Sequence, residues 1–271
     1  APASPEGAGP AGGQASSEPD DAAALSNADE MLNLPAGARP TILSIRSIII
    51  DPGHGGSDTG CRGRTLAEKD LTLIIAKRVQ KLAEAMPGLT VSLTRDSDTE
   101  KTLDTRVNFA KLRRADVFVS LHAGASLASA AHGFEVFCQP RSNDSSHPRR
   151  SNPAAESRVS AASLQLGTAL AQGLTQTTSA ENRGIHQVKC RILNELPMPG
   201  VLLEVGCLTN PSEEELLQTE DYQARIAQGI LAQIQPPALL APAAPAAPTT
   251  SPTPTAPTTA PAAEQVQGST P

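Results

Sequence analysis

The sequence predicts a single α/β domain with disordered tails, in which a mostly parallel, twisted sheet is covered by helices on both faces. Three observations predict this class. Short β-branched or apolar runs alternate along the chain with longer stretches whose apolar residues recur with a period of about 3.6 residues. Of the 24 prolines, six lie in residues 1–40 and ten in residues 236–271. The residues between these two ends are numerous enough to bury one sizeable core.

Both ends of the chain are predicted to be disordered. Residues 1–41 are rich in Ala, Pro, Gly and Ser, and residues 236–271 in Pro, Ala and Thr. Such segments bury too little apolar surface to offset their chain entropy. The acidic excess also lies in these ends, and it accounts for the whole formal net charge of −6. Residues 42–235 are therefore predicted to form one globular domain with balanced charge.

The composition of the chain argues against two classes of partner. A charge-balanced core with 2% aromatic residues and no Trp lacks the basic patch and the stacking platforms of nucleic-acid-binding proteins. No stretch of the sequence approaches the roughly 18 consecutive apolar residues of a membrane span. We therefore expect no nucleic-acid partner and no membrane span within this chain.

Each element of the domain follows from a local pattern. The β-branched run Ile42–Ile50 ends at Asp51-Pro52-Gly53, which predicts a strand and then a tight loop. Glu68–Met86 has an apolar stripe with helical spacing and is followed by Pro87-Gly88. The same reasoning predicts the other elements in chain order: strand Leu89–Thr94, helix Leu103–Arg113, strands Asp116–His122 and Gly133–Cys138, surface loop Gln139–Pro153, helix Ala154–Thr178, strands Ile185–Val188 and Val201–Glu204, and helices near Pro211–Gln218 and Asp221–Ile234.

Polar residues follow three of the apolar strands. His54 comes just after the first strand, His122 ends the third, and Glu204 ends a late one. Ligands of an α/β sheet gather beyond the carboxyl ends of its strands. Glu68 opens the first helix, and the glycine-rich loop 53–63 allows it to fold back toward His54. The sequence thus predicts that these four side chains meet at one edge of the sheet.

Two imidazoles and one carboxylate form the ligand type of an open catalytic zinc site. The fourth position holds a water whose pKa the metal lowers to about 7, and Glu204 is then placed to take the proton of that water. Taken singly, these residues also have structural explanations, because an acid such as Glu68 complements the dipole at a helix N-terminus. Three further histidines, His132, His147 and His186, lie in polar or loop contexts, and we expect them at the surface or beside the substrate.

The block Ile48–Gly56 resembles the signature of zinc-dependent N-acetylmuramoyl-L-alanine amidases, and in particular the type-3 amidase catalytic domain of bacterial cell-wall hydrolases. Further blocks match in order and spacing, so the resemblance covers about residues 46–234. These blocks are Glu68–Leu71, Leu93–Asp98, Leu103–Arg106, Ala115–Ala123, Asn182–Gly184 and Val201–Gly206.

The resemblance implies that His54, Glu68 and His122 bind one Zn²⁺ ion and that Glu204 is the catalytic glutamate. It also implies the reaction, which is hydrolysis of the amide between N-acetylmuramic acid and the L-alanine of the stem peptide in peptidoglycan. That reaction serves cell-wall remodelling or daughter-cell separation. The implied location is periplasmic or extracellular, because the substrate lies there.

The sequence departs from the family pattern at a few positions. Gly124 stands where the family usually has Asn, whereas Cys207 and Val205 replace residues of other types and are expected to change packing only. Some members carry a helix that blocks the site until a partner removes it. Here Gln139–Arg158 is short and polar, so we expect little or no autoinhibition by this route. The need for an activator protein stays open.

Two alternatives to the amidase remain. The same residues suit another zinc hydrolase, such as a peptidase or a deacetylase. A wall-binding or scaffold protein with this fold would lack a ligand or the glutamate, and neither is missing here. The four cysteines show neither a Cys-x-x-Cys pair nor zinc-finger spacing. The sequence favours buried thiols over disulfides, but it does not determine whether the cysteines pair.

Overall fold

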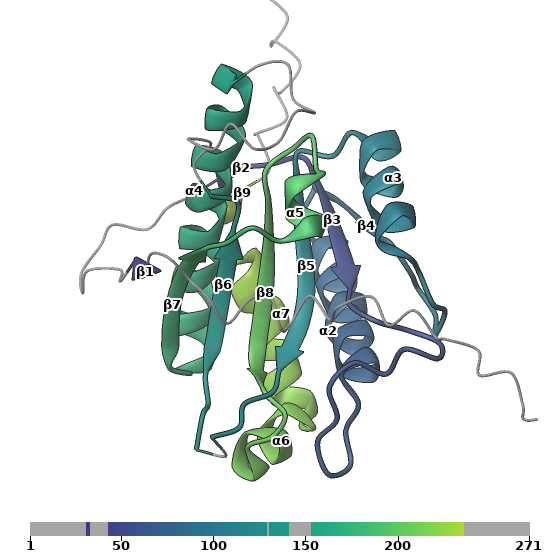
Figure 1. Cartoon of the computed structure of the whole chain (residues 1–271), viewed down its shortest axis with the longest axis vertical. Helices are drawn as coiled ribbons and strands as arrows, with labels where there is room; N and C mark the ends of the chain where they lie inside the picture. The colour runs from purple at the N-terminus through teal and green to yellow at the C-terminus, as the bar shows by residue number, and fades with distance from the viewer. Residues whose placement is uncertain (1–30, 33–42, 129, 141–152, 236–271) are drawn as a thin grey trace, which may run out of the picture. The chain divides into compact units, whose positions relative to one another are not determined.

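The computed structural model describes residues 31–32, 43–128, 130–140 and 153–235, all within the unit Ala1–Pro237 (Figure 1). Almost all of the two predicted tails and most of the predicted loop Gln139–Pro153 lie outside the described residues. The elements, in chain order, are β1 (Met31–Leu32), β2 (Leu43–Ser44), β3 (Ser47–Pro52), α2 (Glu68–Ala83), β4 (Thr90–Leu93), α3 (Leu103–Arg113), β5 (Val117–Gly124), β6 (Phe134–Cys138), α4 (Pro153–Thr178), β7 (Asn182–Gln187), α5 (Arg191–Asn194), β8 (Gly200–Cys207), α6 (Pro211–Leu217), α7 (Glu220–Leu231) and β9 (Ile234–Gln235).

Seven strands form one sheet in the order β1-β7-β6-β8-β5-β3-β4. The neighbours β3–β4, β3–β5, β5–β8 and β6–β7 are parallel, whereas β6–β8 and β1–β7 are antiparallel. A separate parallel pair joins β2 to β9. The predicted mostly parallel α/β sheet is therefore confirmed.

Helices cover both faces of this sheet, as predicted (Figure 1). On one face, which we call the three-helix face, α2, α4 and α7 pack over a large apolar cluster that includes Leu121 and Leu203. On the other, the two-helix face, α3 and α5 pack over a smaller cluster that includes Phe118 and Leu202. Successive residues of a strand point to opposite faces, so each central strand contributes to both clusters.

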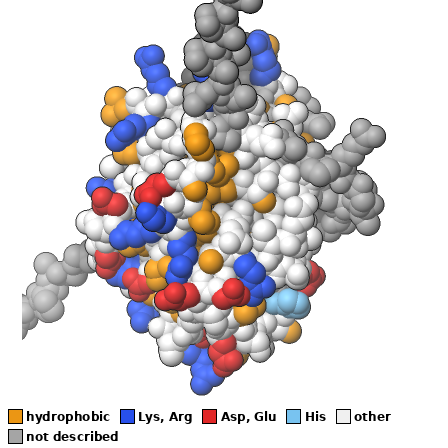
Figure 2. All heavy atoms as spheres, turned by 180° about the vertical axis from the view of Figure 1, so that it is seen from behind, with side chains coloured by type: hydrophobic (Ala, Val, Ile, Leu, Met, Phe, Trp, Pro, Cys, Tyr) orange, Lys and Arg blue, Asp and Glu red, His pale blue; other side chains and the backbone are white. Residues whose placement is uncertain are grey.

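The outer surface of the three-helix side is uneven in charge (Figure 2). Lys, Arg, Asp and Glu side chains gather over α2 and its neighbours, beside a narrow strip of hydrophobic side chains. By contrast, α4 is rich in Ala, Ser, Thr and Gln and adds little charge to this surface. Among the described helices, none combines the length and the apolar character that crossing a bilayer requires.

Several element boundaries differ from the prediction. The single strand expected at Ile42–Ile50 is wrong, because Leu43–Ser44 pairs with β9 while Ser47–Pro52 joins the main sheet. The strands β5 and β8 continue beyond His122 and Glu204, so these side chains lie within the strands rather than at their ends. The four-residue helix α5 was not predicted. By contrast, α3 has the predicted bounds.

Candidate metal centre

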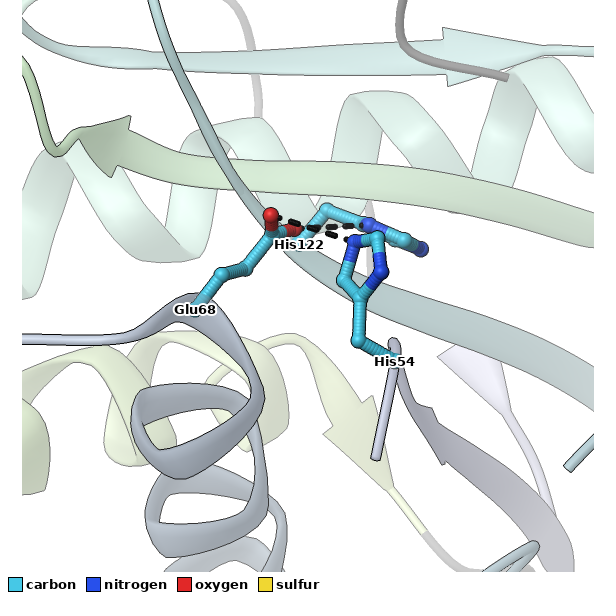
Figure 3. A group of neighbouring side chains, drawn as sticks. All are labelled: His54, Glu68 and His122. Carbon is cyan, nitrogen blue, oxygen red and sulfur yellow. Dashed lines mark hydrogen bonds and ion pairs between the residues drawn. The ribbon is translucent and has the colours of Figure 1, made fainter. Parts of the chain in front are cut away.

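Three side chains from separate elements meet at the carboxyl-end edge of the sheet (Figure 3). His54 follows β3, Glu68 is the first residue of α2, and His122 lies near the end of β5. One ligand atom from each of them lies within 4.8 Å of the other two. The structure therefore brings together the three residues predicted as metal ligands, over sequence separations that only the fold can close.

The Glu68 carboxylate lies between the two imidazoles. Its Oε1 atom is 2.8 Å from His122 Nδ1, and its Oε2 atom is 3.1 Å from His54 Nε2. Two backbone amides fix its orientation, since Ala123 N donates to Oε1 at 3.1 Å and Cys61 N donates to Oε2 at 2.7 Å. Burial raises the pKa of Glu68, but its hydrogen bonds and charge interactions with the two histidines outweigh burial and lower that pKa. The carboxylate is thus held ionised and fixed in direction.

Asp58 orients the imidazole of His54. Its Oδ2 atom lies 2.8 Å from His54 Nδ1, which leaves Nε2 facing Glu68. Burial lowers the pKa of His54, but the carboxylates of Glu68 and Asp58 outweigh that effect and raise it to about 9. A carboxylate on the second ring nitrogen is typical of histidines that bind metal ions. Asp58 was not singled out from the sequence, although its position four residues after His54 in a glycine-rich loop is a usable signal.

Two glycines make room for this cluster. A Cβ atom at Gly53 would lie 2.5 Å from Cε1 of His122, and one at Gly60 would lie 2.5 Å from both Glu68 Oε2 and His54 Cδ2. Real Cβ atoms do not approach other atoms so closely, so larger residues here would displace the ligands. The glycine-rich loop therefore serves packing around the ligands as well as chain reversal.

The residues present fit a zinc ion on their own chemistry. Two imidazole nitrogens and one carboxylate oxygen are the protein ligands of open catalytic zinc sites. The aspartate on His54 and the amides on Glu68 supply the outer contacts that orient such ligands. In the part of the chain that the structure describes, this is the group of His, Cys, Asp and Glu side chains that could hold a metal ion.

Glu204 lies beside the cluster on the two-helix face. In the sheet register it is the partner of His122 on β5 and of Glu135 on β6. Its side chain is 9% exposed, and its Oε2 atom is buried without a hydrogen-bond partner. Burial, followed by the charges of Glu68 and Glu135, raises the pKa of Glu204 well above its usual range. Carboxyl groups with a strongly raised pKa are common at sites of proton transfer.

The three positions that depart from the family pattern lie in different surroundings. A Cβ atom at Gly124 would lie 3.1 Å from Glu204 Oε2, so any side chain at this position would contact the glutamate. Cys207 and Val205 are buried in β8, as expected for packing positions. All four cysteines are thiols in the structure, with Cys61 partly exposed and the other three buried.

A buried polar network lies next to the site, and the sequence reasoning gave its members no role. The Asp51 carboxylate accepts hydrogen bonds from Thr94, from Ser120 at 2.9 Å and from Arg106 at 2.7 Å. Burial raises the pKa of Asp51, but Arg106 and the hydroxyl donors outweigh burial and lower it. An acid that directly follows an apolar strand was an available signal for such a network.

The remaining histidines divide between surface and interior. His132 is exposed and lies 3.1 Å from Glu181, in agreement with the prediction. The prediction for His186 is wrong, because it is 9% exposed in β7 and stacks on Phe137 with 5.2 Å between ring centroids. His186 lies in the expected strand, and it is buried because this strand pairs with β6 and places the imidazole against Phe137. His147 lies outside the described residues.

Comparison with protein families matches residues 48–236 to the family described as N-acetylmuramoyl-L-alanine amidase. Among curated proteins, the chain is 35% identical to the N-acetylmuramoyl-L-alanine amidase LytC of Bacillus subtilis, over 68% of this chain and 34% of that protein. It is 30% identical to the amidase AmiC of Escherichia coli, over 69% of this chain and 52% of that protein. The chain thus spans about a third of one relative and about half of the other.

Two solved structures share the fold over nearly their whole length. The catalytic domain of the amidase CwlV from Bacillus (Paenibacillus) polymyxa var. colistinus superposes with a TM-score of 0.60 at 36% identity, over 70% of this chain and 96% of that one. An N-acetylmuramoyl-L-alanine amidase from Clostridium difficile 630 gives a TM-score of 0.61 at 31% identity, over 70% and 95% of the two chains. The family match over residues 48–236 contains all four candidate site residues.

Proposed function

The chain belongs to the N-acetylmuramoyl-L-alanine amidase family, and on this premise we propose that it is a zinc-dependent hydrolase of bacterial peptidoglycan. Its reaction is cleavage of the amide between N-acetylmuramic acid and the L-alanine of the stem peptide. The observation that carries this proposal is the convergence of His54, Glu68 and His122 beside Glu204, whose Oε2 atom is buried without a hydrogen-bond partner.

In this proposal His54, Glu68 and His122 hold one Zn²⁺ ion. A bound zinc ion supplies a Lewis acid that polarises the scissile carbonyl and lowers the pKa of a water. Asp58 keeps the Nε2 atom of His54 turned toward the shared point, and the amide of Cys61 keeps the Glu68 carboxylate there. The ligands are thus oriented by the protein before the substrate arrives.

Glu204 moves the proton. Hydrolysis adds the oxygen of one water to the lactyl carbonyl carbon, breaks the C–N bond, and leaves a lactyl carboxyl group and an amino group on L-alanine. The Glu204 carboxylate takes a proton from the attacking water and gives it to the departing nitrogen. Burial raises the pKa of Glu204, which makes its carboxylate a stronger proton acceptor than that of an exposed glutamate.

The wider setting is also part of the proposal. Residues 42–235 form the catalytic domain, whereas residues 1–41 and 236–271 lie almost entirely outside the described residues. The location is periplasmic or extracellular, where peptidoglycan lies, and the role is cell-wall remodelling or daughter-cell separation. A 28% identical relative, the CwlD amidase from Clostridioides difficile, has a solved structure in complex with the GerS lipoprotein. On that precedent we include an activator protein among the partners.

The test is digestion of purified peptidoglycan by the full chain, with mass spectrometry of the products. We expect free stem peptides that begin at L-alanine, formed by the wild type and not by Glu204→Gln. Cleavage within the stem peptide would indicate a peptidase, and released acetate a deacetylase. Zinc binding without cleavage, with or without the activators of related amidases, would favour a wall-binding protein.

A further inference from the structure

The backbone around His54 is held by two buried arginines. Arg106 donates from Nη1 to the Pro52 carbonyl and from Nη2 to the His54 carbonyl, both at 2.7 Å. Arg95 donates from Nε to the Pro52 carbonyl at 3.0 Å and from Nη2 to the Gly53 carbonyl at 2.7 Å. Three consecutive carbonyl groups, ending at His54 itself, are therefore fixed by guanidinium groups.

Arg95 also ties this loop to the helix that carries Glu68. The same Nη2 atom that donates to the Gly53 carbonyl donates to the Lys69 carbonyl at 2.8 Å. Gly53 immediately precedes His54, and Lys69 immediately follows Glu68. One nitrogen atom therefore sets the spacing between the chain neighbours of two candidate ligands.

The conformation of His54 explains why such support is needed. Its φ angle is 59°, in the left-handed region that non-glycine residues rarely adopt. Residues held there persist only where the surrounding structure fixes them. The next two residues, Gly55 and Gly56, also have positive φ angles and add no stiffness of their own.

The positive charges of these two arginines do not explain how they would favour zinc binding. Arg95 and Arg106 are 3% and 4% exposed, and Arg106 pairs with the buried Asp51 carboxylate. Burial and the nearby Arg106 lower the pKa of Arg95. Buried cations this close to a site for a divalent cation oppose its binding electrostatically, so their benefit there must be geometric.

We propose that Arg95 and Arg106 are positioning residues, which hold the backbone on both sides of His54 so that His54 and Glu68 are correctly spaced before zinc binds. This inference rests on the zinc site of the proposed function. Arginine suits the task because its planar fork donates several hydrogen bonds at fixed angles, whereas lysine presents a single ammonium group.

The test measures the zinc dissociation constant of the 271-residue chain by competition with a chromophoric chelator. Arg95→Lys and Arg106→Lys keep the charge and lose the fork. We expect each to raise the dissociation constant about 10- to 100-fold, the range seen when outer contacts of metal ligands are removed. Excess zinc should return kcat close to the wild-type value. Arg78→Lys is the matched control, since Arg78 lies on α2, 3.7 Å from the exposed Glu220.

Two other outcomes separate the explanations. If the arginines only stabilise the fold, the lysine variants melt at a lower temperature but bind zinc like the wild type while folded, and this would overturn the proposal. If charge alone matters, Arg95→Gln binds zinc more tightly than the wild type, which would also overturn it. A wild-type chain that binds no zinc would instead contradict the proposed function.

Discussion

The two faces of the central sheet are built from the same strands but differ in what they carry at the carboxyl ends of those strands. On the three-helix face the strands stay apolar to their carboxyl ends, with Leu121 followed by Ala123 on β5 and Leu203 by Val205 on β8. On the two-helix face, the apolar Phe118 of β5 is followed further along the strand by His122, and Leu202 of β8 is followed by Glu204. One face therefore keeps a continuous core while the other changes from core to site along each strand.

The placement of α5 explains where that change occurs. A Cβ atom at Gly200, the first residue of β8, would contact Leu193 of α5 and the nearby Leu196. The helix thus covers the amino end of β8, and Figure 1 shows it far from the carboxyl ends of the strands. Because neighbouring residues of a strand point to opposite faces, β8 places a core residue directly beside a candidate site residue. Substitutions at adjacent positions should therefore have unlike effects.

The largest effect is expected at Glu204 on the two-helix face. Glu204→Gln removes the proton acceptor and should lower the rate of stem-peptide release about 100- to 10,000-fold. Stability should not fall, because the substitution removes a buried, unpartnered carboxylate oxygen. Release rates and thermal melting of the same preparations check both statements. A variant that keeps a tenth or more of the activity would show that Glu204 does not carry the proton.

The neighbouring residue on the three-helix face should behave in the opposite way. Leu203→Ala truncates a fully buried side chain and should cost about 2–5 kcal/mol in the free energy of unfolding. The activity of the folded molecules should stay within about threefold of the wild type. Urea unfolding and activity assays under native conditions measure the two quantities. Unchanged stability together with lost activity would break the distinction between the faces.

A glycine pair tests the packing of the ligands themselves. Gly60 and Gly88 have φ angles of 61° and 88°, so alanine strains the backbone at both, by about 1 kcal/mol. Only at Gly60 would the added Cβ atom meet Glu68 and His54. Gly60→Ala should therefore weaken zinc binding about tenfold, and Gly88→Ala should leave it unchanged. Equal zinc affinities in the two variants would remove the packing role of Gly60.

The smallest effect concerns the loop that precedes Glu68. The Glu214 carboxylate accepts the amide hydrogens of residues 64–66 at 2.7–3.0 Å. Burial raises the pKa of Glu214, but these bonds outweigh burial and lower it from 4.5 to about 2. A pKa lowered by folding contributes stability above about pH 4.5, and that contribution is lost as the pH falls toward 2.

Glu214→Gln should therefore cost about 1–2 kcal/mol at pH 7, and the difference from the wild type should shrink between pH 4.5 and 2. Urea unfolding at several pH values measures it. A difference that stays constant with pH would mean that the carboxylate charge contributes nothing.

The sequence was informative where residue type and local pattern coincide. The helix α3 has its predicted bounds because Thr102 caps its N-terminus and the left-handed Arg114 ends it. His54 and His122 stand out because each comes at the end of an apolar run in the sequence. Two-residue strands such as β2 carry no periodicity, so their pairing was not predictable.

The supports of the site were harder to predict. Arg95 and Arg106 donate to the carbonyl groups of residues 52–54, which lie 42–54 positions away in the chain. Any backbone can offer such carbonyls, so no pattern of residue types marks these contacts. The candidate ligands were therefore recognisable from residue chemistry, whereas the residues that orient them required the fold.

The most direct test of the proposed zinc amidase site on the two-helix face begins by removing metal from the full chain with a chelator. Zinc is then added back in steps, and the release of stem peptides is measured at each step. We predict that chelation abolishes release, that added zinc restores it with a plateau at one ion per chain, and that Glu204→Gln binds the same zinc without release. Release that continues at the wild-type rate after complete removal of metal would contradict the assignment of His54, Glu68 and His122 as a catalytic zinc site.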